Sequence, residues 1–308
     1  TEWKRIDEDE EGIISLETTL RGICDKERFM DLFENFILFD QGKKGTVKLI
    51  AKNHQYLGVN RAIQQVIDSK LNKGRLGVFW HTQGSGKSYS MVFFCRKILR
   101  KISNNYSFLI VTDREELDRQ IYTTFKNVDA ISTGDERAAS GNHLRELLAA
   151  NKGFVFTLIH KFNESQVVTR RDNIIVISDE AHRTQNGFLA YNMRMAIPNA
   201  GFIGFTGTPL IKGEDEKTKE IFGDYVSVYD FQRAVDDNAT VPLYYENRGE
   251  HLHLSNPEIN QQMREAVEEE TLDLSQLERV RNLFLKNYPI LTAEQRLRQI
   301  AQDIVWHF

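Results

Sequence analysis

The sequence has little cysteine and no long apolar run. Only two cysteines, Cys24 and Cys95, occur among the 308 residues, and no Cys/His cluster has zinc-ligand spacing. This count fits a reducing cytoplasm without a disulfide framework. No stretch approaches the roughly 18 apolar residues of a membrane-spanning helix, so no membrane partner is expected. The acidic start TEWKRIDEDEEG does not read as a signal peptide, and without a first Met it suggests a fragment or a processed chain.

Positive charge is not in excess either. The 40 Lys and Arg residues against 44 Asp and Glu residues give a formal net charge of -4. This balance argues against a protein that coats DNA through bulk charge, but it permits a DNA motor whose basic contacts are local. The hydrophobic share of 41% and the charged share of 27% are ordinary for a globular protein of one large domain or two smaller ones.

From residue 76 onward, short apolar runs alternate with helical segments. Most runs are continuously apolar, which is typical of strands covered by helices on both faces of a mostly parallel sheet. The expected strands are 76–80, 108–112, 128–132, 154–159, 173–178, 201–206 and 241–246. The expected helices are 87–101, 114–125, 142–150, 183–196 and 230–237. Asp113 and Glu116 have capping-box spacing at the second of these helices. The pattern predicts a doubly wound α/β domain.

Helical patterns also flank this region. Asp25 can cap the helix expected in DKERFMDLFENFILF, whose apolar residues recur at helical spacing as far as Ile37. A second helix has a clean apolar face within 55–71, and QGKKGT at 41–46 reads as a linker. Residues 257–308 have helical spacing without strands. We therefore expect helical extensions at both ends.

The sharpest motif is HTQGSGKS, residues 81–88, between an expected strand and an expected helix. A phosphate-binding loop requires that context. Two glycines let backbone N–H groups surround phosphate oxygens, Lys87 can reach the β- and γ-phosphates of ATP, and the Ser88 hydroxyl can bind Mg²⁺. The strict pattern has Gly where this chain has His81, so we interpret the loop as a variant, and a chance glycine-rich turn is the alternative. The candidate nucleotide-binding residues are Thr82, Gln83, Gly84, Ser85, Gly86, Lys87 and Ser88.

A second motif, IIVISDEAHR at 174–183, brings an acidic pair to the carboxyl end of an expected strand, where open α/β sheets bind ligands. Asp179 is expected to hold Mg²⁺, and Glu180 to orient and deprotonate the attacking water. These two residues and Lys87 are the candidate catalytic residues, and His182 is a candidate coupling residue. The alternative is an acidic helix start that the helix dipole favours.

Together these motifs resemble superfamily 2 helicases and translocases. GFTGTP at 204–209 is similar to the motif that links the ATP state to nucleic-acid contacts, and the resemblance implies Thr206 and Thr208 as couplers. LIVTDREELDRQ at 109–120 and TLIHKF at 157–162 resemble loops that touch a nucleic-acid backbone. The contacts implied there are Arg114, Arg119 and Lys161. An ordinary structural role is the alternative for each segment.

KNHQYLGVNRAI, residues 52–63, resembles the adenine-recognition element of the same superfamily. Gln55 is the implied adenine contact, because an amide presents a donor and an acceptor side by side. Its alternative role is that of a helix-start residue.

The resemblance is most specific to the R subunit of type I restriction–modification enzymes. It rests on HQYLGVNRAI, FWHTQGSGKS, VTDREELDRQ, SDEAHR, GFTGTPL and YDFQRAVDDNATVPLYYENR, within about residues 1–250. It implies a double-stranded DNA translocase driven by ATP and Mg²⁺, in a complex with methylation and specificity subunits. The alternatives are another superfamily 2 motor used in repair or remodelling, and a nucleotide-binding switch that does not turn over ATP.

The resemblance also suggests how the chain divides. Residues 1–45 are expected to be a helical linker after a nuclease domain, 46–249 a RecA-like ATP-binding lobe, and 250–308 a helical linker toward a second RecA-like lobe. Because that second lobe supplies catalytic arginines, we expect the chain alone to bind nucleotide and to hydrolyse it poorly. Glu2-Trp3-Lys4 and Asp215-Glu216-Lys217 fit an acid-x-Lys nuclease element but lack its preceding strand, so no cleavage residues are assigned.

Overall fold

The structure, a computed structural model, describes residues 3–10, 12, 14–42, 45–131, 136–162, 166–180, 188–208, 215–242 and 294–307. Thr1–Leu243 form one compact unit and Tyr244–Phe308 a second. The described part of the second unit is one helix, α13 (Glu294–His307). In the part of the chain that the structure describes, no helix has both the length and the apolarity needed to cross a bilayer.

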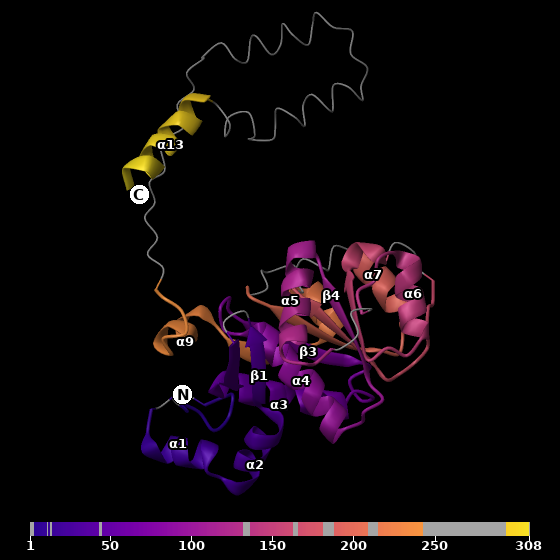
Figure 1. The fold of residues 1–308 in the computed structure, drawn as a ribbon, viewed down its shortest axis with the longest axis horizontal. Helices are drawn as coiled ribbons and strands as arrows, with labels where there is room; N and C mark the ends of the chain where they lie inside the picture. Colours follow the sequence, from indigo (N-terminus) through magenta and orange to yellow (C-terminus); the bar gives the residue numbers. More distant parts are fainter. Residues whose placement is uncertain are drawn as a thin grey trace, which may run out of the picture. The chain divides into compact units, whose positions relative to one another are not determined.

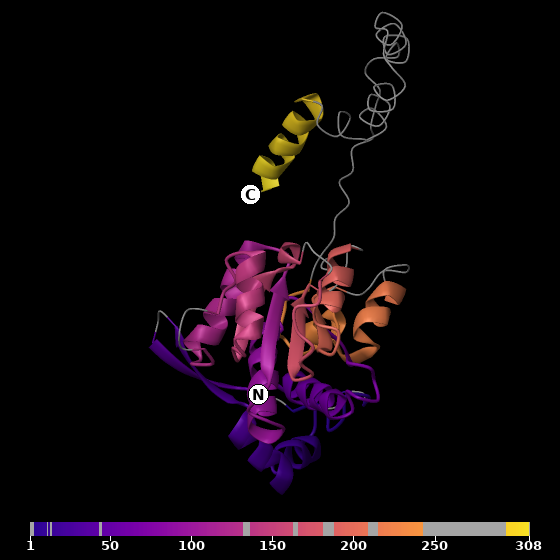
Figure 2. The same ribbon diagram turned by 90° about the vertical axis from the view of Figure 1, so that its right-hand side faces the viewer.

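A six-stranded sheet forms the centre of the first unit (Figures 1 and 2). Its strands are β3 (Arg75–His81), β4 (Ser107–Thr112), β5 (Phe154–Leu158), β6 (Ile174–Asp179), β7 (Gly201–Thr206) and β8 (Tyr225–Tyr229). They lie in the order β5-β4-β6-β7-β3-β8, and all neighbours are parallel. Since parallel strands end at the same edge, the segments after β6, β7 and β3 are brought together. Asp179 pairs with Phe205 and Thr206 with Trp80 at that edge.

Helices cover both faces of this sheet. One apolar core includes Phe79 and Ile110 with residues of α3, α4 and α5, and a second includes Val78 and Val111 with residues of α6, α7 and α8. The helices are α3 (Asn53–Ile67), α4 (Lys87–Lys101), α5 (Glu115–Asn127), α6 (Gly141–Ala149), α7 (Phe188–Ala196) and α8 (Asp215–Phe222). Adjacent strand residues thus enter opposite cores, which explains the continuous apolar runs. The predicted α/β fold, a parallel sheet with helices on both faces, is confirmed.

The first fifty residues fold differently from the prediction in two respects: the helix expected in DKERFMDLFENFILF ends at Asn35, because Ile37–Gly42 form a strand, and residues 41–46 are not a linker. α1 (Leu16–Ile23) and α2 (Lys26–Asn35) precede an antiparallel hairpin of β1 (Ile37–Gly42) and β2 (Gly45–Ile50). The predicted cap is confirmed, because the Asp25 carboxylate accepts from two N–H groups of α2. The interpretation of 41–46 as a linker is wrong, because Gln41 pairs with Thr46 and Gly42 with Gly45 at the ends of the two strands. The boundaries predicted at residues 45 and 249 stay predictions.

Three further element predictions need correction. Residues 128–131 do not form a strand, since Val128 ends α5 and Asp129 has a φ of 52°. The Asp113–Glu116 capping box does not form, because α5 begins after Arg114 without a side-chain cap. Residues 241–242 are not in a strand, and the rest of the predicted strand 241–246 lies outside the described residues.

Besides β1 and β2, three further elements were not predicted. β8 and α8 were both missed, although YVSVY has the β-branched and aromatic composition of a strand. The short helix η1 (Ile159–Lys161) follows β5. The predicted helix 230–237 corresponds to α9 (Phe231–Asp236), which directly follows β8.

Candidate functional site

The loop between β3 and α4 bends sharply at two glycines. Gly84 has a φ of 79° and Gly86, which caps α4, a φ of 90°. Residues with a side chain rarely adopt such left-handed backbone, so this shape depends on glycine at both positions. The first N–H groups of a helix lack intrahelical partners, and its dipole is positive there. The start of α4 at Lys87 therefore offers an anion a set of donors.

Gln55 at the start of α3 braces this loop. Its Oε1 accepts from the Lys52 N–H at 2.9 Å, and its Nε2 donates to the Gly86 carbonyl at 3.1 Å. A Cβ on Gly86 would lie 2.8 Å from that Nε2, so the contact also requires glycine. Gln55 thus combines the helix-start role with a contact to the loop. Each amide atom keeps one further hydrogen-bonding position, which suits a base edge.

Lys87 lies among the three loops that converge at the carboxyl edge. Its Nζ donates to the His81 carbonyl at 3.0 Å. A Cβ on Gly207, in the turn after β7, would lie 3.0 Å from the Lys87 Nζ and 3.1 Å from the Gln83 Cγ. Burial lowers the pKa of Lys87, and the nearby carboxylates of the acidic pair partly offset this shift. The phosphate loop, the acidic pair and the TGT turn therefore share one small volume.

The acidic pair has two different environments. Asp179 is only 6% exposed at the end of β6. Burial and the neighbouring charge of Glu180 raise the pKa of Asp179 to about 6, against the opposing effect of Lys87. Glu180 is less buried, and its backbone is left-handed with a φ of 49°. Such a conformation is strained for a residue with a side chain and is common at functional sites.

The two candidate coupling threonines close the turn after β7. Thr206 is fully buried; its Oγ1 donates to the Thr208 carbonyl at 3.0 Å and accepts from the Thr208 N–H at 3.3 Å. These bonds hold Gly207 against the phosphate loop. The third candidate coupler, His182, lies outside the described residues.

The three candidate nucleic-acid contacts differ in their exposure to solvent. Arg114 and Arg119 are exposed, at the start and in the middle of α5, and Arg114 pairs with Asp113 at 3.4 Å. Lys161 is half-buried, and its Nζ donates to the Ala138 carbonyl. Lys161 therefore has a structural contact, whereas both arginines present their charge to solvent.

The sequence did not mark a buried histidine pair below the loop. His54 Nε2 bonds the Ser85 carbonyl at 3.1 Å, and its ring stacks on Tyr229 with centroids 3.7 Å apart. Burial lowers the pKa of His54 to about 4 and that of His81 well below its ordinary value, so both rings are neutral near pH 7. The sequence signal that could have revealed this pair is His81, which stands at the first position of the phosphate-loop motif, where the strict pattern has Gly.

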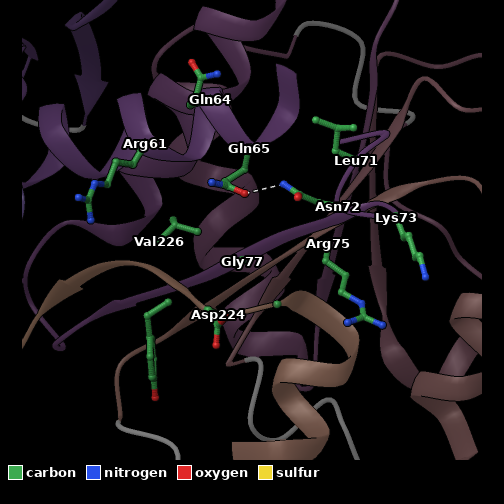
Figure 3. A pocket seen from close by; sticks show the side chains of 12 residues that line it. Arg61, Gln64, Gln65, Leu71, Asn72, Lys73, Arg75, Gly77, Asp224 and Val226 are labelled. Carbon is green, nitrogen blue, oxygen red and sulfur yellow. Dashed lines mark hydrogen bonds between the residues drawn. The ribbon is translucent and has the colours of Figure 1, made fainter. Parts of the chain in front are cut away.

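A separate cavity of about 740 Å³ lies at the other end of β3 (Figure 3). Its lining includes Arg61, Lys73, Arg75 and Asp224. Figure 3 shows these side chains pointing in different directions, and the only bond drawn joins Gln65 and Asn72 at 2.7 Å. Among the described residues, no group of three His, Cys, Asp or Glu side chains could hold a metal ion.

Known proteins that resemble this chain include an ATPase family and subunits of restriction enzymes. A model of the SWI2/SNF2 ATPase family matches residues 54–276. The HindI endonuclease subunit of a type I restriction enzyme from Haemophilus influenzae is 40% identical over 100% of this chain and 31% of its own length. The MjaIXP endonuclease subunit from Methanocaldococcus jannaschii, also named for a type I restriction enzyme, is 38% identical over 96% of this chain and 29% of its own length.

Solved structures are less alike in detail. The Sulfolobus solfataricus SWI2/SNF2 ATPase core in complex with double-stranded DNA has a TM-score of 0.43 and 14% identity, over 62% of this chain and 38% of that one.

Proposed function

The chain belongs to the SWI2/SNF2 ATPase family, and on that premise we propose that it is the ATP-binding lobe of a double-stranded DNA translocase. We place this motor in the R subunit of a type I restriction enzyme, because the relatives at 40% and 38% identity are endonuclease subunits of such enzymes. The chain spans only 31% and 29% of their length, so DNA movement, cleavage and subunit partners are proposals for the whole protein.

One observation carries the proposal: the Lys87 ammonium approaches the turn at Gly207, and the charges of both carboxylates of the acidic pair act on its pKa. A triphosphate at the start of α4 would meet this ammonium at its β- and γ-phosphates. The Ser88 hydroxyl and the Asp179 carboxylate are hard oxygen ligands, which fit Mg²⁺ when phosphate oxygens and water complete its shell. Bound Mg²⁺ would supply charge neutralisation at the phosphates.

The remaining roles follow from position. Glu180, less buried than its neighbour, would orient the attacking water and take its proton. Gln55 would use its remaining amide positions to bind the adenine edge. Thr206 and Thr208 would transmit the nucleotide state, because their turn contacts the loop that holds the γ-phosphate. The exposed Arg114 and Arg119 would contact DNA phosphates, with methylation and specificity subunits supplying sequence recognition.

The test uses the full R subunit with its methylation and specificity partners. Glu180→Gln should leave Mg–ATP affinity within about threefold and reduce DNA-stimulated turnover by about 10²–10⁴-fold, the usual contribution of a general base. Glu115→Gln, an exposed acid at the start of α5, is the matched control. Normal turnover by Glu180→Gln would remove the assigned base.

The DNA used in the same assay separates the restriction motor from another superfamily 2 motor. Turnover that requires a duplex with the unmodified recognition site supports restriction. Equal stimulation by any duplex supports a repair or remodelling motor.

A further inference from the structure

Residues 3–10 pack onto the elements that hold the phosphate loop. Trp3 is only 2% exposed, and its ring lies 5.3 Å from that of Tyr56 in α3. The Arg5 backbone exchanges two hydrogen bonds of 3.0 Å with the Asn53 side chain. Lys4 Nζ forms an ion pair of 2.6 Å with Asp237, just after α9. This segment is thereby held to α3 and to the residue that follows α9.

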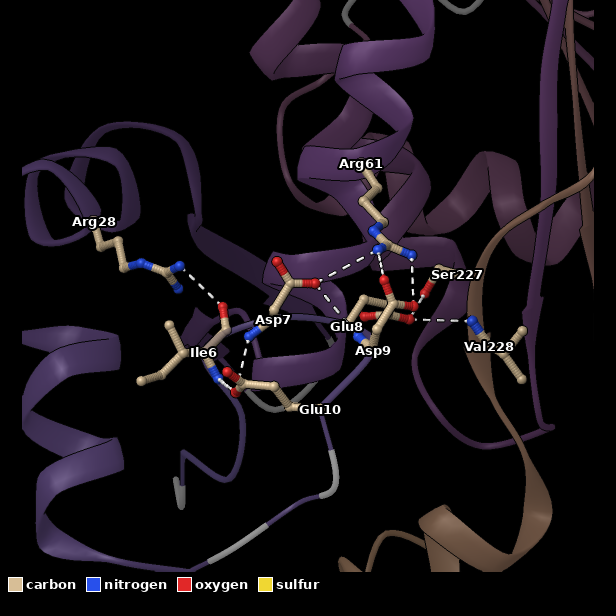
Figure 4. A network of polar contacts seen from close by, with 9 residues as sticks. All are labelled: Ile6, Asp7, Glu8, Asp9, Glu10, Arg28, Arg61, Ser227 and Val228. Carbon is tan, nitrogen blue, oxygen red and sulfur yellow. Dashed lines mark hydrogen bonds and ion pairs between the residues drawn. The ribbon is translucent and has the colours of Figure 1, made fainter.

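Within the segment, the buried Glu8 lies between two exposed acids. Its side chain is 8% exposed, and its Oε1 accepts from the Ser227 Oγ at 2.5 Å and from the Val228 N–H at 3.1 Å. Asp7 and Asp9 on either side are exposed and pair with Arg61 (Figure 4). A buried carboxylate is costly unless it accepts hydrogen bonds, so the two bonds from β8 account for its inward placement.

The contact continues from Ser227 to the phosphate loop. Ser227 is 1% exposed, and the His81 Nε2 lies 2.7 Å from its Oγ. His81 is fully buried, and its carbonyl is the acceptor for the Lys87 Nζ at 3.0 Å. Three buried side chains from the initial segment, β8 and β3 thus form one chain of contacts that ends at the partner of Lys87.

The direction of the hydrogen bonds along this chain is determined by Glu8. Burial raises the pKa of Glu8, while the hydrogen bonds from Ser227 and Val228 and the charges of Arg233 and Arg61 oppose this shift and favour the ionised form. An ionised carboxylate only accepts, so the Ser227 hydroxyl donates to Glu8. The neutral His81 ring must then donate from Nε2 to the same oxygen, which leaves Nδ1 as the bare nitrogen. The Nδ1 atom has no hydrogen-bond partner among the described residues. Without Glu8, Ser227 could donate to His81 instead, and a proton on Nδ1 would be buried without an acceptor.

We propose that Glu8 is a positioning residue of the nucleotide site: through Ser227 it fixes the tautomer and the orientation of His81, and so the carbonyl that holds Lys87. The segment 3–10 is then a working part of the ATP-binding unit. This inference rests on the proposed ATP-binding function and adds to it a residue outside every motif of the family resemblance.

The experiment measures the dissociation constant of Mg–ATP for the 308-residue chain and its variants by calorimetry. Glu8→Ala and Ser227→Ala should each weaken binding about tenfold, because each leaves a buried polar group of the chain without its partner. Glu8→Gln keeps an oxygen that accepts the same two bonds, so its affinity should return to within about threefold of the original. Asp9→Ala, in the same segment but exposed, is the matched control and should bind normally.

A second readout separates positioning from general stability. The ¹⁵N shifts of the His81 ring should report a proton on Nε2 in the unaltered chain and in Glu8→Gln, and a changed tautomer in Glu8→Ala. If Glu8→Ala does not fold, Ser227→Ala decides, because it cuts the link to His81 and leaves Glu8 bonded to the Val228 N–H. Unchanged affinity in Ser227→Ala, or an equal loss in Glu8→Gln and Glu8→Ala, would overturn the proposal.

Failure of the proposed function would look different. An unaltered chain that binds no Mg–ATP contradicts the ATP-binding assignment. The tautomer comparison needs no nucleotide, so it would still test the link from Glu8 to His81.

Discussion

The two ends of β3 differ in a way that cavity size does not reveal. Its amino end borders a cavity of about 740 Å³ with cationic and amide side chains that do not converge. Its carboxyl end brings Lys87, Asp179 and Gly207 together, with shifted pKa values at Lys87 and Asp179 and left-handed backbone at Gly84, Gly86 and Glu180. The candidate site at the carboxyl end is thus distinguished by the convergence of three loops and by the burial of charged groups. The following predictions test that comparison.

The largest effect is expected at Lys87. Lys87→Ala removes the ammonium at the converging loops and should weaken Mg–ATP binding by about 100-fold or more, since losing a buried charged partner costs ~3 kcal/mol. The fold should persist, as judged by an unchanged thermal midpoint. Lys73→Ala, a lysine at the amino-end cavity, is the matched control and should bind normally. Equal losses in both variants would erase the distinction between the two ends.

Gly77→Ala should damage the amino end without damaging the site. The new Cβ would lie 1.9 Å from a Val226 methyl and 2.8 Å from the Asp224 carbonyl, at a φ of 101°. We expect a loss of about 3 kcal/mol in the free energy of unfolding, from strain and overpacking, measured in urea. Gly45→Ala has a similar φ of 104° with no atom within 4 Å, so it isolates the backbone strain. Weakened Mg–ATP binding by folded Gly77→Ala would contradict the expected independence.

Gly207→Ala should act on the site with little effect on stability. Its Cβ would displace the Lys87 ammonium, 3.0 Å away, and we expect about tenfold weaker Mg–ATP binding. Gly153→Ala adds the same methyl where no atom lies within 4 Å, so it should change nothing. An unaltered affinity in Gly207→Ala would show that the TGT turn does not constrain Lys87.

Protonation of Asp179 should give the smallest and most gradual effect. Because its pKa is raised to about 6, the carboxyl keeps its proton below that pH, and Mg²⁺ must displace it. Mg–ATP affinity should therefore be constant at high pH and fall as the pH drops through 6, reaching about a tenfold loss at pH 5. Asp179→Asn has no carboxyl to titrate, so the pH dependence of its Mg–ATP affinity should reflect only the titration of the nucleotide. A common pH profile for both proteins would refute the shifted pKa.

The sequence predicted the parallel sheet and the position of the candidate site at its edge because the evidence for them is local. A glycine-rich turn between a strand and a helix, or an acidic pair at the end of an apolar run, can be recognised within ten residues. His54 and Ser227 could not be found in this way, since their contacts join residues 31 and 146 positions apart. The hairpin of β1 and β2 was missed because the polar and glycine residues at the facing ends of its strands resemble a linker until Gln41 is seen to pair with Thr46 and Gly42 with Gly45.

Strand order has a consequence for how the site comes into being. β3 pairs with β7 and β8, whose residues follow it by more than a hundred positions. A growing chain would carry the complete phosphate-loop sequence long before the edges of β3 are covered, and contacts so distant in sequence form slowly. The proposed nucleotide site would thus be complete only after nearly the whole first unit has been synthesised. Nucleotide binding would then stabilise the chains in which every strand has paired.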